Sequence, residues 1–206
     1  MKYCIIIPDG CADLPLKELG GLTCLEYAKT PNMDKIAQFA FIGQVQTIPP
    51  SLTPGSDVAT LSLLGFDPEK YYTGRSPLEV VSMGVDLKDT QMSFRCNLVY
   101  IEDNIMKDYS AGHISTSEAE EIIEKLNEEI NIPGIRFYTG VSYRHAVVID
   151  NTEIDAVCTP PHDISDKYIK DYLPKGKGSE FLIRIMEKAR PIVSKMSNKA
   201  NSLSLI

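Results

Sequence analysis

The stretch Tyr3-Cys4-Ile5-Ile6-Ile7-Pro8-Asp9-Gly10, YCIIIPDG, is the part of the sequence from which the fold is predicted. Consecutive apolar and β-branched positions are typical of a strand that is buried on both faces of a parallel sheet. The Pro-Asp-Gly turn ends this strand and leaves Asp9 at its carboxyl end. Ligands of α/β folds bind at that edge of the sheet, so we expect an α/β fold with Asp9 in its site.

A second stretch, TPGSDVATLSLLG at residues 53–65, indicates a turn that leads into a short helix. Val58, Leu61 and Leu64 repeat at helical spacing after the Pro-Gly turn. Ser56 at the start of this helix has two interpretations: it is an N-cap, or it is a nucleophile in the positive field of the helix N-terminus. Asp57 is interpreted as a first-turn carboxylate that compensates the helix dipole.

Other segments are assigned by apolar periodicity and by turn residues. We expect helices over 31–41, 77–83, 115–130 and 180–195, with Pro191 kinking or ending the last one, and strands over 45–48, 93–101, 104–109, 136–138 and 144–149. The pattern of expected helices and strands changes near residue 90. We therefore predict three parts: an α/β core part at 1–87, an α+β domain at 88–178, and a helix at 179–206 that returns to the core.

Composition narrows the class of protein. The chain has 206 residues and a formal net charge of −7, which argues against a sequence-blind nucleic-acid binder. Its five cysteines are scattered without a C-x-x-C pair, so we expect them to be inert thiols in a reduced, cytoplasmic compartment. The apolar run at residues 3–7 is too short for a signal peptide or a membrane span, and no membrane partner is expected.

Asp9 and Ser56 together suggest a chemistry. A carboxylate at a strand end can hold a divalent cation, and that cation would lower the pKa of a nearby serine. The helix N-terminus at Ser56 also favours a bound phosphate. The two residues therefore indicate a metal-assisted phosphoryl-transfer site.

The motifs PDGCADLPLKELGG, TPNMDKIA, PGSDVATLSLLGFDP and YYTGRSPLE, followed by FRCNLV, SAGHIST, GVSYRH and PPHDI, occur in this order along the chain. In order and spacing they resemble the archaeal-type cofactor-independent phosphoglycerate mutases, which belong to the alkaline phosphatase superfamily. The resemblance implies part of an alkaline-phosphatase-like α/β core with an inserted α+β lid domain. It also implies a glycolytic enzyme that interconverts 3- and 2-phosphoglycerate without 2,3-bisphosphoglycerate.

The resemblance further implies roles for individual residues. Asp9 matches a metal-binding aspartate, and Ser56 matches the serine that is phosphorylated during transfer and also contacts the metal. Two divalent cations, manganese or magnesium and sometimes zinc, would complete the site. The residues expected near the small phosphorylated acid substrate are Arg75, Arg95, His113, Arg144 and His145.

Each of these substrate residues has a structural alternative. Arg75 could satisfy loop carbonyls, His113 could cap the following helix, and Arg144 and His145 could be residues of a strand face. His162, beside Asp163, is interpreted as a loop stabiliser.

The sequence departs from the family pattern in one respect. The remaining family metal motifs, of the types D-E-A-G-H-x-G-D and D-H, do not occur in it. We therefore expect the front portion of a mutase that is inactive alone and associates with itself or with a complementing C-terminal half. The alternatives are a related phosphotransferase, of the proposed homoserine kinase or phosphonate-processing type, and a non-catalytic binding or assembly module.

Overall fold

The structure of the protein is a computed structural model that describes residues 2–8, 10–151 and 153–206. The chain divides into two compact units, Met1–Thr47 and Ile48–Ile206.

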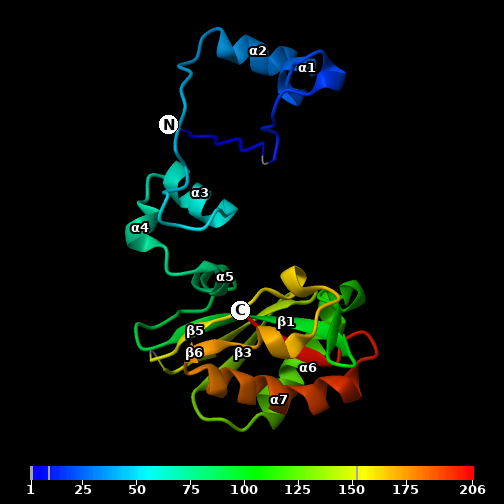
Figure 1. The fold of residues 1–206 in the computed structure, drawn as a ribbon. Coiled ribbons are helices and arrows are strands. Elements are labelled where there is room, and N and C mark those ends of the chain that lie inside the picture. Colours follow the sequence, from blue (N-terminus) through cyan, green and yellow to red (C-terminus); the bar gives the residue numbers. More distant parts are fainter. Residues whose placement is uncertain (1, 9, 152) are drawn as a thin grey trace. The chain divides into compact units, whose positions relative to one another are not determined.

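The first unit contains short helices (Figure 1): η1 (Lys17–Leu19), α1 (Cys24–Tyr27) and α2 (Pro31–Ala37). A capping box starts α1, since the Thr23 hydroxyl accepts the Glu26 N–H and the Glu26 carboxylate accepts the Thr23 N–H. Proline occupies the first position of α2, as the sequence predicts, but the helix ends at Ala37 rather than near residue 41.

The strand expected at residues 3–7 is absent from the described part of this unit. Residues 3–7 are exposed and are not assigned to a strand, and the strand expected at residues 45–48 is not formed either. A strand is defined by hydrogen bonds to a neighbouring strand, and no described residue supplies such a neighbour here. The apolar run therefore has a potential for strand formation that no pairing within the described residues satisfies.

The second unit begins with three helices, α3 (Ser56–Leu63), α4 (Pro68–Tyr71) and α5 (Arg75–Ser82). An antiparallel sheet follows, built from β1 (Met92–Glu102), β2 (Ile105–Asp108), β3 (Ile135–Val141), β4 (Arg144–Ile149) and β7 (Ser202–Leu205). The strand order is β2-β1-β4-β3, and β7 also pairs with β1, at residues 96–99. A separate hairpin joins β5 (Asp155–Val157) to β6 (Lys175–Lys177).

Helices α6 (Thr116–Glu129) and α7 (Ser179–Met196) cover one face of the sheet (Figure 1). Phe94, Cys96 and Leu98 of β1 point into the core below these helices, together with Leu126 and Leu182. Helix α5 packs on the opposite face through Val80, against Ala146 and Val148. Alternate residues of β1 and β4 therefore face two different environments.

Most elements of the second unit confirm the sequence predictions. The strands β1 to β4 and the helices α5, α6 and α7 lie within a few residues of their expected bounds. Pro191 does not end α7, which continues to Met196. The chain is thus a mixed α/β protein with an antiparallel sheet, while the phosphatase-like core with an inserted lid stays a prediction.

Candidate functional site

Ser56 is the first residue of α3 and does not cap it. The N-cap is Gly55, in extended conformation and without a side chain to accept an N–H. Within the described chain the Ser56 hydroxyl makes no hydrogen bond, and its backbone carbonyl accepts the Thr60 hydroxyl at 2.6 Å. A hydroxyl at the positive end of a helix that has no structural partner is available to react. The N-cap interpretation of Ser56 is therefore wrong, and its role as a nucleophile stays a prediction.

Asp57 fixes the start of this helix. Its Oδ1 accepts the Val58 N–H at 3.0 Å, and its Oδ2 accepts the Tyr72 hydroxyl at 2.5 Å. A Cβ on Gly55 would lie 2.4 Å from Asp57 Oδ1, so only glycine fits there without displacing the carboxylate. Asp57 therefore joins α3 to the segment that follows α4, beyond the dipole role expected from the sequence.

The Asp57–Tyr72 contact shifts the pKa values of both groups. Burial acts to raise the pKa of Asp57, but the hydrogen bonds from Tyr72 and Val58 and the charge of Arg75 together lower it below its usual value. Burial and the bond to Asp57 raise the pKa of Tyr72 to about 12. Tyr72 is thus a stable donor and Asp57 a stable anion at neutral pH.

The Glu79 carboxylate forms ion pairs with two arginines, Arg75 and Arg95. Arg75 begins α5, and its Nε lies 2.7 Å from Glu79 Oε1 one helical turn later. Arg95 on β1 places its Nε 2.9 Å from Glu79 Oε2. Glu79 therefore connects α5 to the sheet, and each of its oxygens binds a different arginine.

These groups surround a cavity of about 700 Å³, hereafter the arginine cavity. Its walls include Thr53, Pro54, Gly55, Asp57, Tyr72, Gly74, Arg75, Arg95 and His162. Ser56 lines a neighbouring cavity of about 400 Å³ that shares Asp57 and Arg75 with the first. The arrangement places a free hydroxyl, a helix N-terminus and two guanidinium groups within one region, which suits an anionic ligand.

A second group of predicted residues gathers around Tyr143. The His113 and Tyr143 rings are 6.4 Å apart, and the Arg144 guanidinium lies 5.0 Å from the Tyr143 ring. Tyr109 contacts both Tyr143 and His162, at 6.1 Å in each case. Because His162 also lines the arginine cavity, this aromatic group lies next to it.

The segment that carries His113 has an unusual backbone. Ala111, Gly112 and His113 have φ values of 49°, 62° and 52°, and two of them carry a Cβ. The Asp108 carboxylate holds the turn by accepting the Ser110 N–H and hydroxyl and the Gly112 N–H. Residues in such conformations are found often at functional sites, so this strain supports a role for His113.

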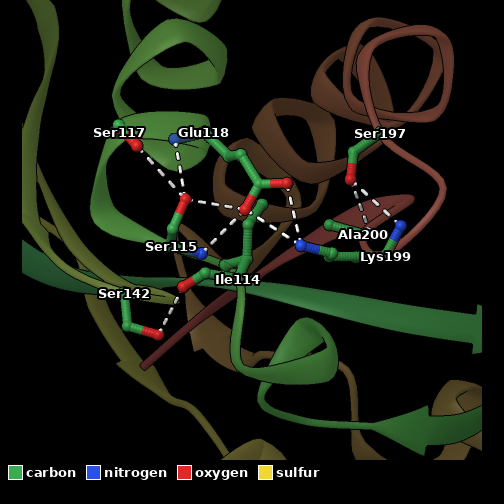
Figure 2. Close-up of polar contacts among 8 residues, drawn as sticks. All are labelled: Ile114, Ser115, Ser117, Glu118, Ser142, Ser197, Lys199 and Ala200. Carbon is green, nitrogen blue, oxygen red and sulfur yellow. Dashed lines mark hydrogen bonds and ion pairs between the residues drawn. The ribbon is translucent and has the colours of Figure 1, made fainter.

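Figure 2 shows how the end of this segment is anchored to α6 and to the chain before β7. Ser115 and Glu118 form a capping box, and the Lys199 ammonium donates to both Glu118 oxygens at 2.8 and 3.0 Å. The Lys199 and Ser115 contacts lower the pKa of Glu118 to about 2. From the β3–β4 turn, the Ser142 hydroxyl donates to the Ile114 carbonyl at 2.7 Å. The adjoining start of α6 and two distant segments, the β3–β4 turn and the chain before β7, thus hold the loop that presents His113.

The family profile described as 2,3-bisphosphoglycerate-independent phosphoglycerate mutase matches residues 37–198. The chain belongs to this family. It is 52% identical to the phosphoglycerate mutase of Methanothrix thermoacetophila, covering 94% of this chain and 48% of the relative. The relative from Methanosarcina mazei is 50% identical, with 94% and 49% covered.

Solved structures agree with the family assignment. A Pyrococcus horikoshii protein matches with a TM-score of 0.68 and 27% identity, over 96% of this chain and 48% of that chain. The cofactor-independent phosphoglycerate mutase of Thermoplasma acidophilum matches with a TM-score of 0.57 and 25% identity, over 95% and 56%. The chain spans about half the length of the curated relatives it matches.

The structure places the site residues predicted from the sequence in more than one group. Arg75 and Arg95 line the arginine cavity, and Ser56 lies beside it. His113 and Arg144 lie in the group around Tyr143, and Asp9 lies outside the described residues. Their assigned roles remain predictions.

His145 has a different environment. It is fully buried opposite Cys96 of β1, and its Nδ1 accepts the Gly140 N–H at 3.1 Å. Its Nε2 is buried, and no described residue bonds to it. Burial lowers the pKa of His145 to about 4, with a smaller opposing effect from the Ser142 backbone. The structure does not bring this neutral imidazole to the arginine cavity.

Two absences concern the described residues. In residues 2–8, 10–151 and 153–206 no group of three His, Cys, Asp or Glu side chains is arranged to hold a metal ion. The described donors therefore do not by themselves form the two-metal site that the family implies. No helix in these ranges is long and apolar enough to cross a membrane.

Three residues of the site were missed or assigned otherwise from the sequence. Tyr72 and Glu79 were not singled out, and His162 was interpreted as a loop stabiliser. The spacing of Arg75 and Glu79 does signal a helical i, i+4 ion pair. Nothing in the spacing signals the contact of Glu79 with Arg95, which brings together residues from α5 and β1.

Proposed function

We propose that this chain supplies the nucleophile and part of the substrate-binding wall of a glycolytic, cytoplasmic phosphoglycerate mutase. The observation that carries the proposal is the free hydroxyl of Ser56 at the N-terminus of α3, beside a cavity lined by two arginines. Membership of the mutase family and relatives of about 50% identity support it.

In the proposed reaction, the Ser56 Oγ attacks the phosphorus of 3-phosphoglycerate. A bond forms between Oγ and phosphorus, the bond from phosphorus to the 3-oxygen breaks, and the serine proton is balanced by protonation of the leaving alkoxide. The 2-hydroxyl then attacks phosphoserine: a bond forms between the 2-oxygen and phosphorus, the bond from phosphorus to Oγ breaks, and loss of the 2-hydroxyl proton is balanced by protonation of Oγ. This step regenerates Ser56 and yields 2-phosphoglycerate. The N-terminal field of α3 stabilises negative charge at Oγ.

Arg75 and Arg95 are proposed to hold the substrate's carboxylate or phosphate, because the planar guanidinium fork binds both groups through paired hydrogen bonds. His113 and Arg144, together with His162, are proposed to complete the wall on the side of Tyr143. The expected manganese or magnesium ions, with Asp9 and Ser56 among their ligands, remain part of the proposal.

The proposed domain organisation keeps the predicted bounds: core residues 1–87, a lid at 88–178, and a closing segment at 179–206. This segment is helical only to Met196, and its last strand, β7, pairs with β1 of the proposed lid. Because the chain spans about half the length of its relatives, we propose that the active site is completed by a second polypeptide segment. The unpaired apolar run at residues 3–7 fits this proposal, since it would pair in a sheet supplied by that segment.

A chimera tests the function. Residues 1–206 replace the matching segment of the Methanosarcina mazei mutase, and interconversion of 3- and 2-phosphoglycerate is assayed with manganese. We expect turnover that Ser56→Ala lowers by about three orders of magnitude or more. Ser62→Ala is the matched control, since it makes the same change on the same helix.

An active chimera whose turnover survives Ser56→Ala contradicts the nucleophile. A folded chimera that is inactive on phosphoglycerates but transfers phosphate to homoserine or cleaves a phosphonate favours the related-enzyme alternative. The 206-residue chain alone is expected to show negligible mutase turnover, and robust turnover would contradict the need for a completing segment.

A further inference from the structure

We propose that Glu79 is a positioning residue that aligns Arg75 and Arg95 as one binding pair for an anionic group of the substrate. The inference rests on the proposed function, because it takes the arginine cavity as the substrate site. Glu79 itself does not line that cavity, whereas both arginines do.

The first support is the division of the Glu79 carboxylate. Oε1 accepts from Arg75 Nε and Oε2 from Arg95 Nε, so neither oxygen is shared by the two arginines. The contacts described for these arginines use Nε alone, which leaves the terminal Nη atoms without a described partner. A guanidinium held by Nε can still offer Nη donors to a carboxylate or phosphate.

The second support is the difference in solvent exposure among the side chains of Arg75, Glu79 and Arg95. The side chains of Arg95 and Glu79 are 12% and 24% exposed, whereas that of Arg75 is 55% exposed. An exposed ion pair contributes little and is readily disordered, but a half-buried charge needs its partner. Glu79 is therefore the counterion that keeps Arg95 in place, and its second oxygen holds the more exposed Arg75 at the same wall.

The third support is electrostatic. Two adjacent guanidinium groups repel each other, and without a carboxylate between them they would separate whenever the cavity lacks an anion. Glu79 cancels one positive charge, so the pair retains a net charge of +1 while both forks stay in place. Pre-organisation of this kind lowers the entropy lost when a ligand binds.

A purely Coulombic view predicts the opposite effect of removing Glu79. A negative charge beside an anion site repels the anion, so its loss would tighten binding. Positioning predicts weaker binding, because the arginines lose their alignment. The sign of the change therefore separates the two explanations.

The experiment measures binding to the 206-residue chain and to the chimera by titration calorimetry. The probes are 3-phosphoglycerate, glycerate as the carboxylate alone, and glycerol 3-phosphate as the phosphate alone. We expect Glu79→Gln to weaken 3-phosphoglycerate binding by about tenfold. The single-anion probe whose affinity falls in parallel identifies the group that the arginines hold.

Glu124→Gln is the matched control, because it removes the same charge from an exposed position on α6. Glu79→Asp keeps the charge but is one methylene shorter, so it should fail to bridge both arginines and should weaken binding as well. This second variant also serves if Glu79→Gln does not fold. In an Arg75→Gln/Arg95→Gln background, Glu79→Gln should have no further effect on binding.

Unchanged or tighter binding by folded Glu79→Gln and Glu79→Asp would overturn the positioning role, and so would an equal loss in the double-arginine background. The proposed function fails in a different way. In that case the wild-type chain and chimera bind none of the probes, or the double-arginine variant binds as the wild type does.

Discussion

Acidification from pH 7 to pH 5 is expected to destabilise the unit Ile48–Ile206 through His145. This side chain is fully buried in the sheet, where its Nδ1 accepts the Gly140 N–H and its Nε2 has no described partner. The second proton would therefore go to Nδ1. The Nδ1–H and the Gly140 N–H would then be two donors facing each other inside the core, with no acceptor between them. The folded protein excludes that proton.

The magnitude follows from proton linkage. Burial lowers the pKa of His145 from 6.5 to about 4, so between these values the unfolded chain binds a proton that the folded chain does not. Stability is full above pH 6.5 and falls as the pH falls toward 4. Between pH 7 and pH 5 this difference lowers the free energy of unfolding by about 2 kcal/mol.

Other groups with shifted pKa values act at lower pH. Asp57, Asp108 and Glu118 all have lowered pKa values, so each stabilises the fold above its ordinary carboxylate pKa and loses that effect as the pH falls through its folded value. Their main effect therefore comes below pH 5. The interval from pH 7 to pH 5 isolates the imidazole from these carboxylates.

The assay is urea denaturation followed by circular dichroism at pH 7, 6 and 5. His145→Leu should remove most of the loss of stability across this interval, whatever its effect on stability at pH 7. Val147→Ala, on the same strand and facing the same core, should lower stability equally at each pH. If His145→Leu keeps the wild-type pH dependence, the imidazole does not carry the effect and its burial does not exclude the proton.

Two further predictions concern the helix that begins with Ser56. Tyr72→Phe should lower the free energy of unfolding by about 1–2 kcal/mol in urea denaturation, since Asp57 loses a charge-assisted hydrogen bond, and an unchanged midpoint would contradict this contact. Gly55→Ala should reduce the turnover of the chimera, because the added Cβ would lie 2.4 Å from Asp57 Oδ1 and would displace that carboxylate. Turnover equal to that of the wild-type chimera would show that the position of Asp57 is not required.

The elements of the second unit were predictable where local signals agree with each other. Helix α6 has Ser115 and Glu118 as a capping box, and its buried residues Ala119, Ile122 and Leu126 repeat at helical spacing. The segment at residues 3–7 has an equally clear local signal but no strand partner among the described residues. Strand formation depends on distant hydrogen bonds, which a local apolar run cannot reveal.

The side-chain contacts of the candidate site were also only partly predictable from local sequence. Arg144 and His145 were grouped as substrate residues because they adjoin in one motif, yet neighbouring residues of a strand point to opposite faces. Arg144 is exposed beside Tyr143, while His145 is buried opposite Cys96. Strand alternation could have indicated that only one of the two faces a given ligand. The link between Glu79 and Arg95 could not have been found this way, because it depends on how α5 packs on the sheet.

The charged groups of the site form a connected series rather than separate contacts. From β1 to α3 the order is Arg95, Glu79, Arg75 and Asp57, with Glu79 contacting both arginines and the charge of Arg75 acting on Asp57. Asp57 in turn bonds Val58 within the first turn of the helix that begins at Ser56. An anion that binds the arginines competes with Glu79 and Asp57 for the charge of Arg75. Binding at the cavity wall therefore alters the electrostatic field at the start of α3, where the proposed nucleophile is located.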